Sequence, residues 1–321
     1  GLTENQIIAA DVAPETRYTS AVRNVGEISN KGIEIALNLT PIRTKEVEWD
    51  LGVTFSKNWS KVNKLWNEGD KPVTEYVLKT AYSANFVAKV GEPLGIFQVP
   101  ALATVQDENS PYYGKVIVDA NGIPTTSNSE MKTIGSSAPD FNMGFNTRVS
   151  YKGFTLSAVA DWRKGGYMYS YTAQLMHFVG NTTRSLFNNR EPFVVPNSVI
   201  ALKDGGYAEN NRPVTSDNMS SYYSDSYSDS QFENFIIPKG YVKLRELVLS
   251  YSFPKAWISK LGIQQLDLSL IGRNLFMWTP KANNYVDPET TTFGNDIASE
   301  LGEFAALPST RNIGGGIKVV F

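Results

Sequence analysis

The sequence has no cysteine and only one histidine, His177. The absence of cysteine excludes disulfide bonds, thiolate metal sites and cysteine nucleophiles. A Ser-His-Asp triad would depend on His177 alone, and a lone histidine is more often structural. Neither a glycine-rich phosphate loop nor a His-Glu-x-x-His pattern occurs. The sequence therefore predicts no enzyme, no metal site and no cofactor.

Charge and hydrophobicity exclude two further classes of protein. The chain has 30 Lys and Arg residues and 32 Asp and Glu residues, so it offers no basic field to nucleic acid. No apolar run approaches the roughly eighteen residues that a transmembrane helix needs. The first residues, GLTENQIIAADVAP, lack the basic start and apolar core of a signal peptide, which predicts a cytoplasmic protein or a mature or partial chain.

What the sequence does contain is strict alternation of apolar and polar residues. In GIEIALNLT, Ile33, Ile35 and Leu37 share one face, and Glu34 and Asn38 share the other. Six more segments follow the same period of two: 49–56, 142–151, 154–163, 246–253, 266–273 and 317–321. Period two predicts half-buried strands, and an aromatic content of 12% favours an all-β protein. KAWISKLG predicts one short helical turn, and helix is otherwise nearly absent.

Three features favour a membrane barrel over a soluble sandwich. The polar faces are rich in Ser, Thr, Asn and Gly and carry only single charges. Short connections alternate with long ones (61–83, 164–239 and 277–310), as in outer-membrane barrels. Aromatic residues end the apolar faces, as an interfacial girdle requires: Trp49, Tyr151, Phe154, Trp162, Phe253, Phe276 and Phe321.

The count of strands depends on the segment between residues 60 and 142. The barrel layout needs an even number of strands there, and ANFVAKVGEPLGIFQ and YYGKVIVDA are the two candidates. With them the chain would hold about nine or ten antiparallel transmembrane strands.

The terminal run RNIGGGIKVVF predicts a barrel-assembly signal. Outer-membrane barrels commonly end on a strand with a terminal aromatic, an apolar residue two before it and a glycine further back. Phe321, Val319 and Gly316 have this spacing. An ordinary final strand that ends in phenylalanine is the alternative.

Several stretches, in order from about residue 24 to 321, resemble the SusC/RagA family of TonB-dependent outer-membrane transporters. They are NVGEISNKGIEIALNLTPI, VGEPLGIF, IGSSAPDFNMGFNTRVSYKGFTLSAVADWRKGG, YVKLRELVLSYSFP and LSLIGRNLFMWTPKANNYVDPE. The resemblance implies that residues 1–321 form the C-terminal part of a barrel of about twenty-two strands. Family members are about three times as long, and the plug domain and the N-terminal extension are absent from this chain. We expect the remaining strands in the native polypeptide or in another chain, because unpaired strand edges are costly in lipid.

The resemblance also implies a function and partners. The family imports oligosaccharides, peptides or similar large ligands across the bacterial outer membrane, and outer-membrane lipid surrounds the barrel. The implied partners are a SusD-like surface lipoprotein, the N-terminal barrel and plug portion, and the TonB complex, which the missing portion contacts. This chain would supply barrel wall and extracellular loops.

Two sets of residues are candidates for contact with a ligand, plug or partner. The first is the set of lumen-facing charges, which alternatively pair across neighbouring strands: Glu34, Asp50, Arg148, Asp161, Arg163, Glu246, Asp267, Arg273 and Lys318. The second lies in SDNMSSYYSDSYSDSQFENF, where aromatic rings next to acids suit sugar rings or a partner lipoprotein: Tyr222, Tyr223, Asp225, Tyr227, Asp229 and Phe232. These acids lack the spacing of an EF-hand, and a mobile polar loop is the structural alternative.

Two other classes stay open from the residues alone. A soluble or surface β-sandwich that binds carbohydrate or protein would show the same alternation. A carbohydrate-active enzyme would need a pair of carboxylates across a cleft, and nothing in the sequence pairs them.

Overall fold

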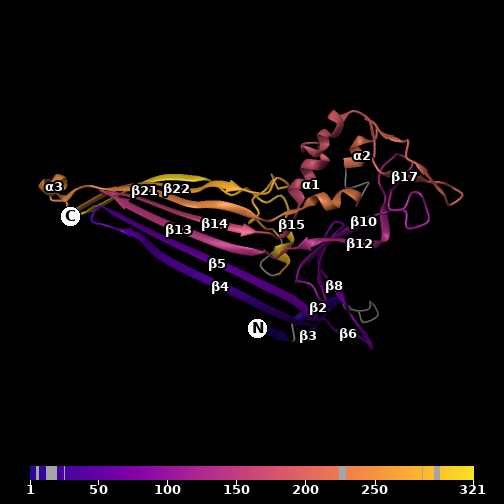
Figure 1. The fold of residues 1–321 in the computed structure, drawn as a ribbon, viewed down its shortest axis with the longest axis horizontal. Coiled ribbons are helices and arrows are strands. Elements are labelled where there is room, and N and C mark those ends of the chain that lie inside the picture. The colour runs from indigo at the N-terminus through magenta and orange to yellow at the C-terminus, as the bar shows by residue number, and fades with distance from the viewer. Residues whose placement is uncertain (5–6, 12–19, 25, 224–228, 284, 293–296) are drawn as a thin grey trace.

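The molecule is built on one long antiparallel sheet. The computed structural model describes residues 1–321 except 5–6, 12–19, 25, 224–228, 284 and 293–296 (Figure 1). The sheet has eight strands, in the order β1 (Leu2–Glu4), β4 (Glu27–Arg43), β5 (Val47–Lys64), β13 (Phe141–Tyr151), β14 (Phe154–Lys164), β21 (Tyr241–Ser252), β22 (Gln265–Trp278) and β24 (Asn312–Val320). Every neighbouring pair is antiparallel, so all seven segments with period two are confirmed as strands of one sheet.

One face of this sheet is apolar and exposed. Along β4, Ile33, Ile35 and Leu37 are each about half exposed. The register continues this face across the sheet, since Ile35 lies opposite Phe55 and Met143 lies opposite both Phe55 and Trp162. No second sheet covers these side chains among the described residues. An exposed apolar face of this extent fits a wall in contact with lipid and not the inner face of a sandwich.

Short connections lie at one end of the sheet and long ones at the other (Figure 1). Residues 152–153 close the β13–β14 hairpin, and Lys152 and Gly153 have φ values of 46° and 88°, as a two-residue hairpin turn requires. The predicted helical turn is α3 (Lys255–Ile258), followed by the 3-10 turn η4 (Ser259–Leu261). The predicted alternation of short and long connections is therefore confirmed, but the first long connection covers 65–140, from β5 to β13, and not 61–83 alone.

The two strands predicted between residues 60 and 142 do not enter the main sheet. β5 pairs directly with β13, so the main sheet of the described residues has eight strands and not nine or ten. ANFVAKVGEPLGIFQ forms β9 (Ala84–Lys89) and the start of β10 (Ile96–Leu102), which pair with each other. YYGKVIVDA contributes only β11 (Val116–Val118). The physical reason is that this segment is buried on both faces: the consecutive residues Phe86, Val87 and Ala88 are all buried. A strand of the barrel would instead have one apolar face toward lipid and one polar face toward the lumen.

The long connections build a second body at their end of the sheet, which we call the loop body. It contains a four-stranded sheet, in the order β12 (Thr126–Ser136), β10, β9 and β8 (Glu75–Ala81). Two three-stranded sheets accompany it, β11–β17 (Ser198–Ala201)–β18 (Tyr207–Glu209) and β20 (Ile236–Pro238)–β15 (Tyr167–Ser170)–β23 (Gly302–Glu303). Three strand pairs complete the described sheets: β2 (Ile7–Asp11) with β3 (Ser20–Asn24), β6 (Asn67–Glu68) with β7 (Lys71–Pro72), and β16 (Phe193–Val194) with β19 (Pro213–Val214).

The helices of the loop body were not predicted. They are α1 (Tyr171–Phe178) and α2 (Met219–Tyr223), with the 3-10 segments η2 (Arg184–Arg190), η3 (Asp229–Phe235) and η5 (Ile297–Leu301). The α1 helix starts at Ser170, whose hydroxyl accepts a hydrogen bond of 3.0 Å from the Ala173 backbone N–H. No helix in the described part of the chain is long and apolar enough to cross a membrane.

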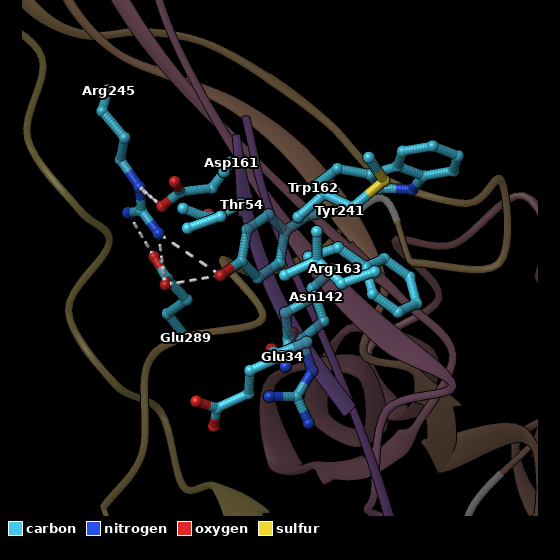
Figure 2. A pocket seen from close by; sticks show the side chains of 15 residues that line it. Glu34, Thr54, Asn142, Asp161, Trp162, Arg163, Tyr241, Arg245 and Glu289 are labelled. Carbon is cyan, nitrogen blue, oxygen red and sulfur yellow. Dashed lines mark hydrogen bonds and ion pairs between the residues drawn. The ribbon is translucent and has the colours of Figure 1, made fainter. Parts of the chain in front are cut away.

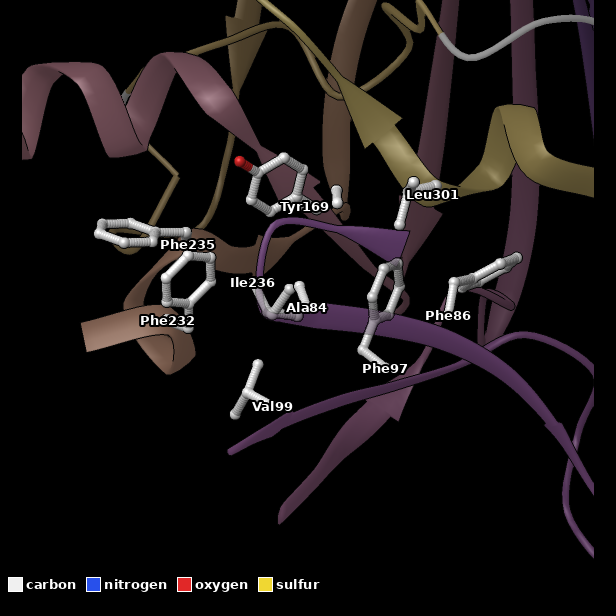
Figure 3. Close-up of a cluster of buried hydrophobic side chains, with 10 residues drawn as sticks. Ala84, Phe86, Phe97, Val99, Tyr169, Phe232, Phe235, Ile236 and Leu301 are labelled. Carbon is white, nitrogen blue, oxygen red and sulfur yellow. The ribbon is translucent and has the colours of Figure 1, made fainter. Parts of the chain in front are cut away.

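The largest core of the molecule lies in the loop body and joins all three long connections (Figure 3). Phe86 and Phe97 come from the first connection, Tyr169 and Phe232 from the second, and Leu301 from the third. All five are at most 1% exposed. The loop body is thus held together by burial of apolar side chains from distant segments.

Gly302 allows the third connection to pack against the second. A Cβ atom at Gly302 would lie 1.9 Å from the Tyr169 carbonyl oxygen, where β23 pairs with β15, and its φ is 149°. Only glycine fits this approach. The next residue, Glu303, is fully buried, and its carboxylate accepts hydrogen bonds from Ser170, Thr172 and Ala306.

Candidate functional site

The predicted lumen-facing charges lie on the polar face of the main sheet, and several lie opposite a charge of the other sign on a neighbouring strand. Arg148 lies opposite Asp50, and Asp267 lies opposite Lys318. Arg273 and Glu246 are also opposite in register, and their Nε and Oε2 atoms are 2.8 Å apart. These positions support the alternative that such charges stabilise neighbouring strands.

Two further cations on this face, Lys243 and Arg245, were missed from the sequence. Between Leu244 and Glu246 the register of β21 shifts against β22, which marks a β-bulge. Because of this bulge Arg245 and Glu246 reach partners on the polar face, although they are neighbours in sequence. The signal was present in YVKLRELVLS, where the apolar positions change phase between residues 244 and 247.

Lys243 and Arg245 hold a segment of the third long connection against the sheet. The Nζ atom of Lys243 lies 2.5 Å from Oδ1 of Asp287, and these side chains are 6% and 4% exposed. The Arg245 guanidinium donates two hydrogen bonds to Glu289 and one, of 2.6 Å, to Asp161 (Figure 2). We call Lys243, Arg245, Asp287 and Glu289 the ionic tether.

The pKa values of the two carboxyls of the ionic tether are lowered. Burial raises the pKa of Glu289, but hydrogen bonds from Arg245, Lys243 and Tyr241 outweigh burial and lower the pKa to about 2. Burial also raises the pKa of Asp287, and its hydrogen bonds, first that from Lys243, bring the pKa below its usual value. Both groups are therefore anionic at neutral pH and stay paired with the cations of β21.

A polar cavity of about 540 Å³ lies beside the ionic tether (Figure 2). Glu34, Asn142 and Arg163 line it from the main sheet, and Glu289 lines it from the third connection. A second cavity, of about 380 Å³, is lined mainly by residues of the same connection, Asp287 among them, together with Thr172 of α1 and Met277 of β22. The tethered segment thus contributes to both cavities, and its position sets the shape of each.

The predicted aromatic loop is only partly a surface. Phe232 is 1% exposed and packs in the core of Figure 3, so it offers no ring face to a ligand, which corrects that expectation. Tyr222 and Tyr223 end α2 and line a third cavity of about 490 Å³, which we call the loop cavity. Asp225 and Tyr227 lie outside the described residues. Asp229 begins η3, and its side chain also lies outside what the structure describes.

His177 has a structural position. It is buried in α1, its Nδ1 atom lies 3.3 Å from the Thr182 hydroxyl, and its ring packs edge-to-face against Tyr223 and Phe235. Among the described residues no group of three His, Cys, Asp or Glu side chains could hold a metal ion.

The residues of the predicted assembly signal belong to β24 and its end. Gly316 lies opposite Ser269 of β22, and Val319 lies opposite Leu266. Phe321 follows the strand and is 80% exposed. The assembly role stays a prediction.

Comparisons with known proteins connect this architecture to a family. No protein-family model matches the sequence. The chain is 24% identical to TonB-dependent receptor P3 of Formosa agariphila, over 99% of the chain and 31% of that receptor. It is 25% identical to TonB-dependent receptor SusC of Bacteroides thetaiotaomicron, over 79% of the chain and 24% of SusC. The chain is therefore similar in sequence to TonB-dependent receptors.

Solved structures show the same fold. A chain of the RagAB peptide transporter matches with a TM-score of 0.67 at 18% identity, over 99% of this chain and 32% of that one. The RagAB peptide importer in its open-open state matches with a TM-score of 0.65 at 19% identity, over all of this chain and 32% of that one. The chain spans about a third or less of the length of the curated relatives it matches.

These similarities confirm the predicted resemblance and the antiparallel β fold of this transporter type. They assign the chain to the bacterial outer membrane, which excludes the cytoplasmic alternative drawn from its first residues. The relatives named here are receptors and transporters, so the chain is not classed as an enzyme.

Proposed function

We propose that the chain forms barrel wall and extracellular loops of a TonB-dependent transporter that imports a large nutrient, such as an oligosaccharide or a peptide. The observation that carries this proposal is the arrangement of the main sheet. One face is apolar and exposed, the other is polar and charged, and the three long connections gather at one end. This is the layout of a wall between lipid and an aqueous lumen with ligand-binding loops on the cell surface.

The open edges of the main sheet support the proposal that it is one part of a larger barrel. β1 and β24 stand at the two edges of the described sheet. Backbone groups at such edges need partners in lipid, where each unsatisfied group costs several kcal/mol. We propose that residues 1–321 are the C-terminal part of the barrel, and that the N-terminal barrel strands and plug complete it.

The partners follow from the same proposal. The similarity to SusC and to a chain of the RagAB transporter supports a SusD-like surface lipoprotein as the partner proposed for this chain. It would cover the loop body at the external end. The TonB complex would act through the part of the transporter outside this chain.

A growth experiment tests the function. A strain that lacks the whole transporter is grown on single nutrients, drawn from a panel of oligosaccharides and peptides. We expect growth to fail on one class of nutrient and to return when the wild-type protein is restored. In uptake assays, a protonophore should block import of that nutrient. Normal growth of the deletion strain on every nutrient, or recovery of the protein in the soluble fraction, would contradict the proposal.

A further inference from the structure

The loop cavity differs from the other two cavities in its chemistry. It is lined by Phe187 of η2, Phe193 of β16, and Tyr222 and Tyr223 of α2. The other lining residues are five apolar ones, Leu102, Val116, Pro124, Val195 and Pro196, and four polar ones, His177, Arg184, Glu233 and Asn234. Its volume of about 490 Å³ lies within the range of small-molecule sites. The polar cavity of Figure 2 is instead lined by several charged side chains.

The aromatic rings around the loop cavity stand at right angles to one another. Phe187 and Phe193 have centroids 4.9 Å apart and planes at 82°. Phe193 and Tyr222 follow at 5.2 Å and 85°, and Tyr222 and Tyr223 at 5.0 Å and 90°. Perpendicular rings present both faces and edges to the enclosed space. The rings therefore lie on different sides of the cavity. This arrangement differs from the flat aromatic surface that the sequence suggested for binding a sugar ring.

Two of these aromatic side chains are buried, and a third is exposed at the entrance of the loop cavity. Phe193 and Tyr223 are each 8% exposed, and the Tyr223 hydroxyl donates a hydrogen bond of 3.2 Å to the Arg184 carbonyl. Phe187 is 53% exposed. A ligand group can therefore enter past Phe187 and contact the rings of Phe193 and Tyr223, which are already ordered by packing.

The charges near the loop cavity oppose a cationic occupant. Arg184 lines the cavity, and burial raises the pKa of the Tyr223 hydroxyl against the opposing positive charge of Arg190. Glu233 also lines the cavity, but its carboxylate pairs with Lys132 at 2.7 Å. A cage for a cation needs electron-rich rings without competing positive charge. A neutral occupant meets no such opposition.

We propose that the loop cavity binds an aromatic or other planar apolar group of the imported ligand. The rings contact such a group edge-to-face and by offset stacking, the arrangements that aromatic pairs prefer. This inference rests on the proposed function for the source of the group, because the cavity lies in the external loop body. The cavity thereby selects ligands that carry a planar apolar group and disfavours wholly polar ones.

The test uses the complete transporter in detergent, with indole as the probe and saturation-transfer NMR and calorimetry as readouts. We expect indole to bind and tetramethylammonium and maltose not to compete. Phe187→Ala removes an exposed rim ring and should weaken indole binding about three- to tenfold, the loss of one aromatic contact. Tyr222→Ala should weaken it by at least as much, and circular dichroism and tryptic digestion would show whether that variant folds.

Phe178→Ala is the matched control, because Phe178 is 51% exposed on α1 and does not line the cavity. It should bind indole as the wild type does. Equal indole affinity in wild type and Phe187→Ala would overturn the proposal, and so would binding of maltose or tetramethylammonium in place of indole. Indole binding that depends on Phe187 in a protein without uptake activity would keep this site and reject only the proposed function.

Discussion

The Nζ atom of Lys243 lies 2.5 Å from Oδ1 and 2.7 Å from Oδ2 of Asp287, and both side chains are almost fully buried. Lys243 belongs to a strand of the main sheet, whereas Asp287 belongs to the last long connection. The pair therefore fixes a segment of the third long connection to the polar face of the main sheet. Buried ion pairs of this kind gain little over apolar residues of the same size, but losing one partner is costly.

Replacement of one partner of this pair should destabilise the tethered segment. Asp287→Asn leaves the Lys243 ammonium buried with only Glu289 as its acid, and we expect a loss of about 3 kcal/mol. Thermal unfolding of the complete protein measures it. The exposed turn variant Asp70→Asn is the control and should cost under about 0.5 kcal/mol. Equal stability of the two variants would show that the pair does not hold the segment.

Acidification should release the same segment over a pH range that is set by the pKa of Glu289. The pKa of Glu289 falls from 4.5 to about 2 on folding. A lowered pKa adds stability that is complete above about pH 4.5 and is lost as the pH falls through about 2. Glu289 is 37% exposed, so solvent screening reduces the size of the effect.

A nitroxide label at position 291 reports this release through its mobility. We expect constant mobility from pH 8 to pH 5 and a rise between pH 4.5 and pH 2. Glu289→Gln, which cannot titrate, should be more mobile at neutral pH and should change less on acidification. A wild-type label whose mobility rises between pH 8 and pH 6 would point to a different group.

An introduced charge should destabilise the protein on one face of β4 and be tolerated on the other. Leu37 and Asn38 are adjacent, both exposed, and on opposite faces of the strand. Leu37→Arg puts a guanidinium into lipid and should cost about 2–4 kcal/mol at mid-bilayer depth, which lowers the amount of folded protein in outer-membrane fractions. Asn38→Arg faces the lumen and should reach wild-type levels. Similar levels of both variants would contradict the assignment of the faces.

The buried carboxylate of Glu303 should hold the start of α1. Its Oε1 atom accepts a hydrogen bond of 2.9 Å from the Thr172 N–H, and its Oε2 atom accepts one of 3.1 Å from the Ala306 N–H. Glu303→Gln replaces one acceptor with an NH₂ group that faces a donor, at a cost of about 1–3 kcal/mol. Hydrogen exchange should become faster over residues 171–178. Unchanged protection there, with Glu108→Gln as the exposed control, would show that the carboxylate is not needed.

Local sequence patterns predicted the strands of the main sheet but not the fold of the loop body. Period-two alternation identified the seven long strands of the main sheet, because successive side chains of any strand point to opposite faces. The same reasoning failed between residues 60 and 142, where apolar residues serve a core that is buried on both sides. Phe232 illustrates the limit: its neighbours in sequence are polar, yet it belongs to the same buried core as Tyr169 and Leu301 from distant segments.

The sequence by itself determined the strands of the wall, which face of each is apolar, and at which end the long connections lie. These properties follow from the geometry of a single strand and from the order of strands along the chain. Only the tertiary structure decided that Asp287 meets Lys243, that Phe187 and Tyr222 enclose a cavity, and that Phe232 is buried. Each of these contacts joins residues far apart in sequence, and their energy comes from burial and pairing that no local pattern encodes.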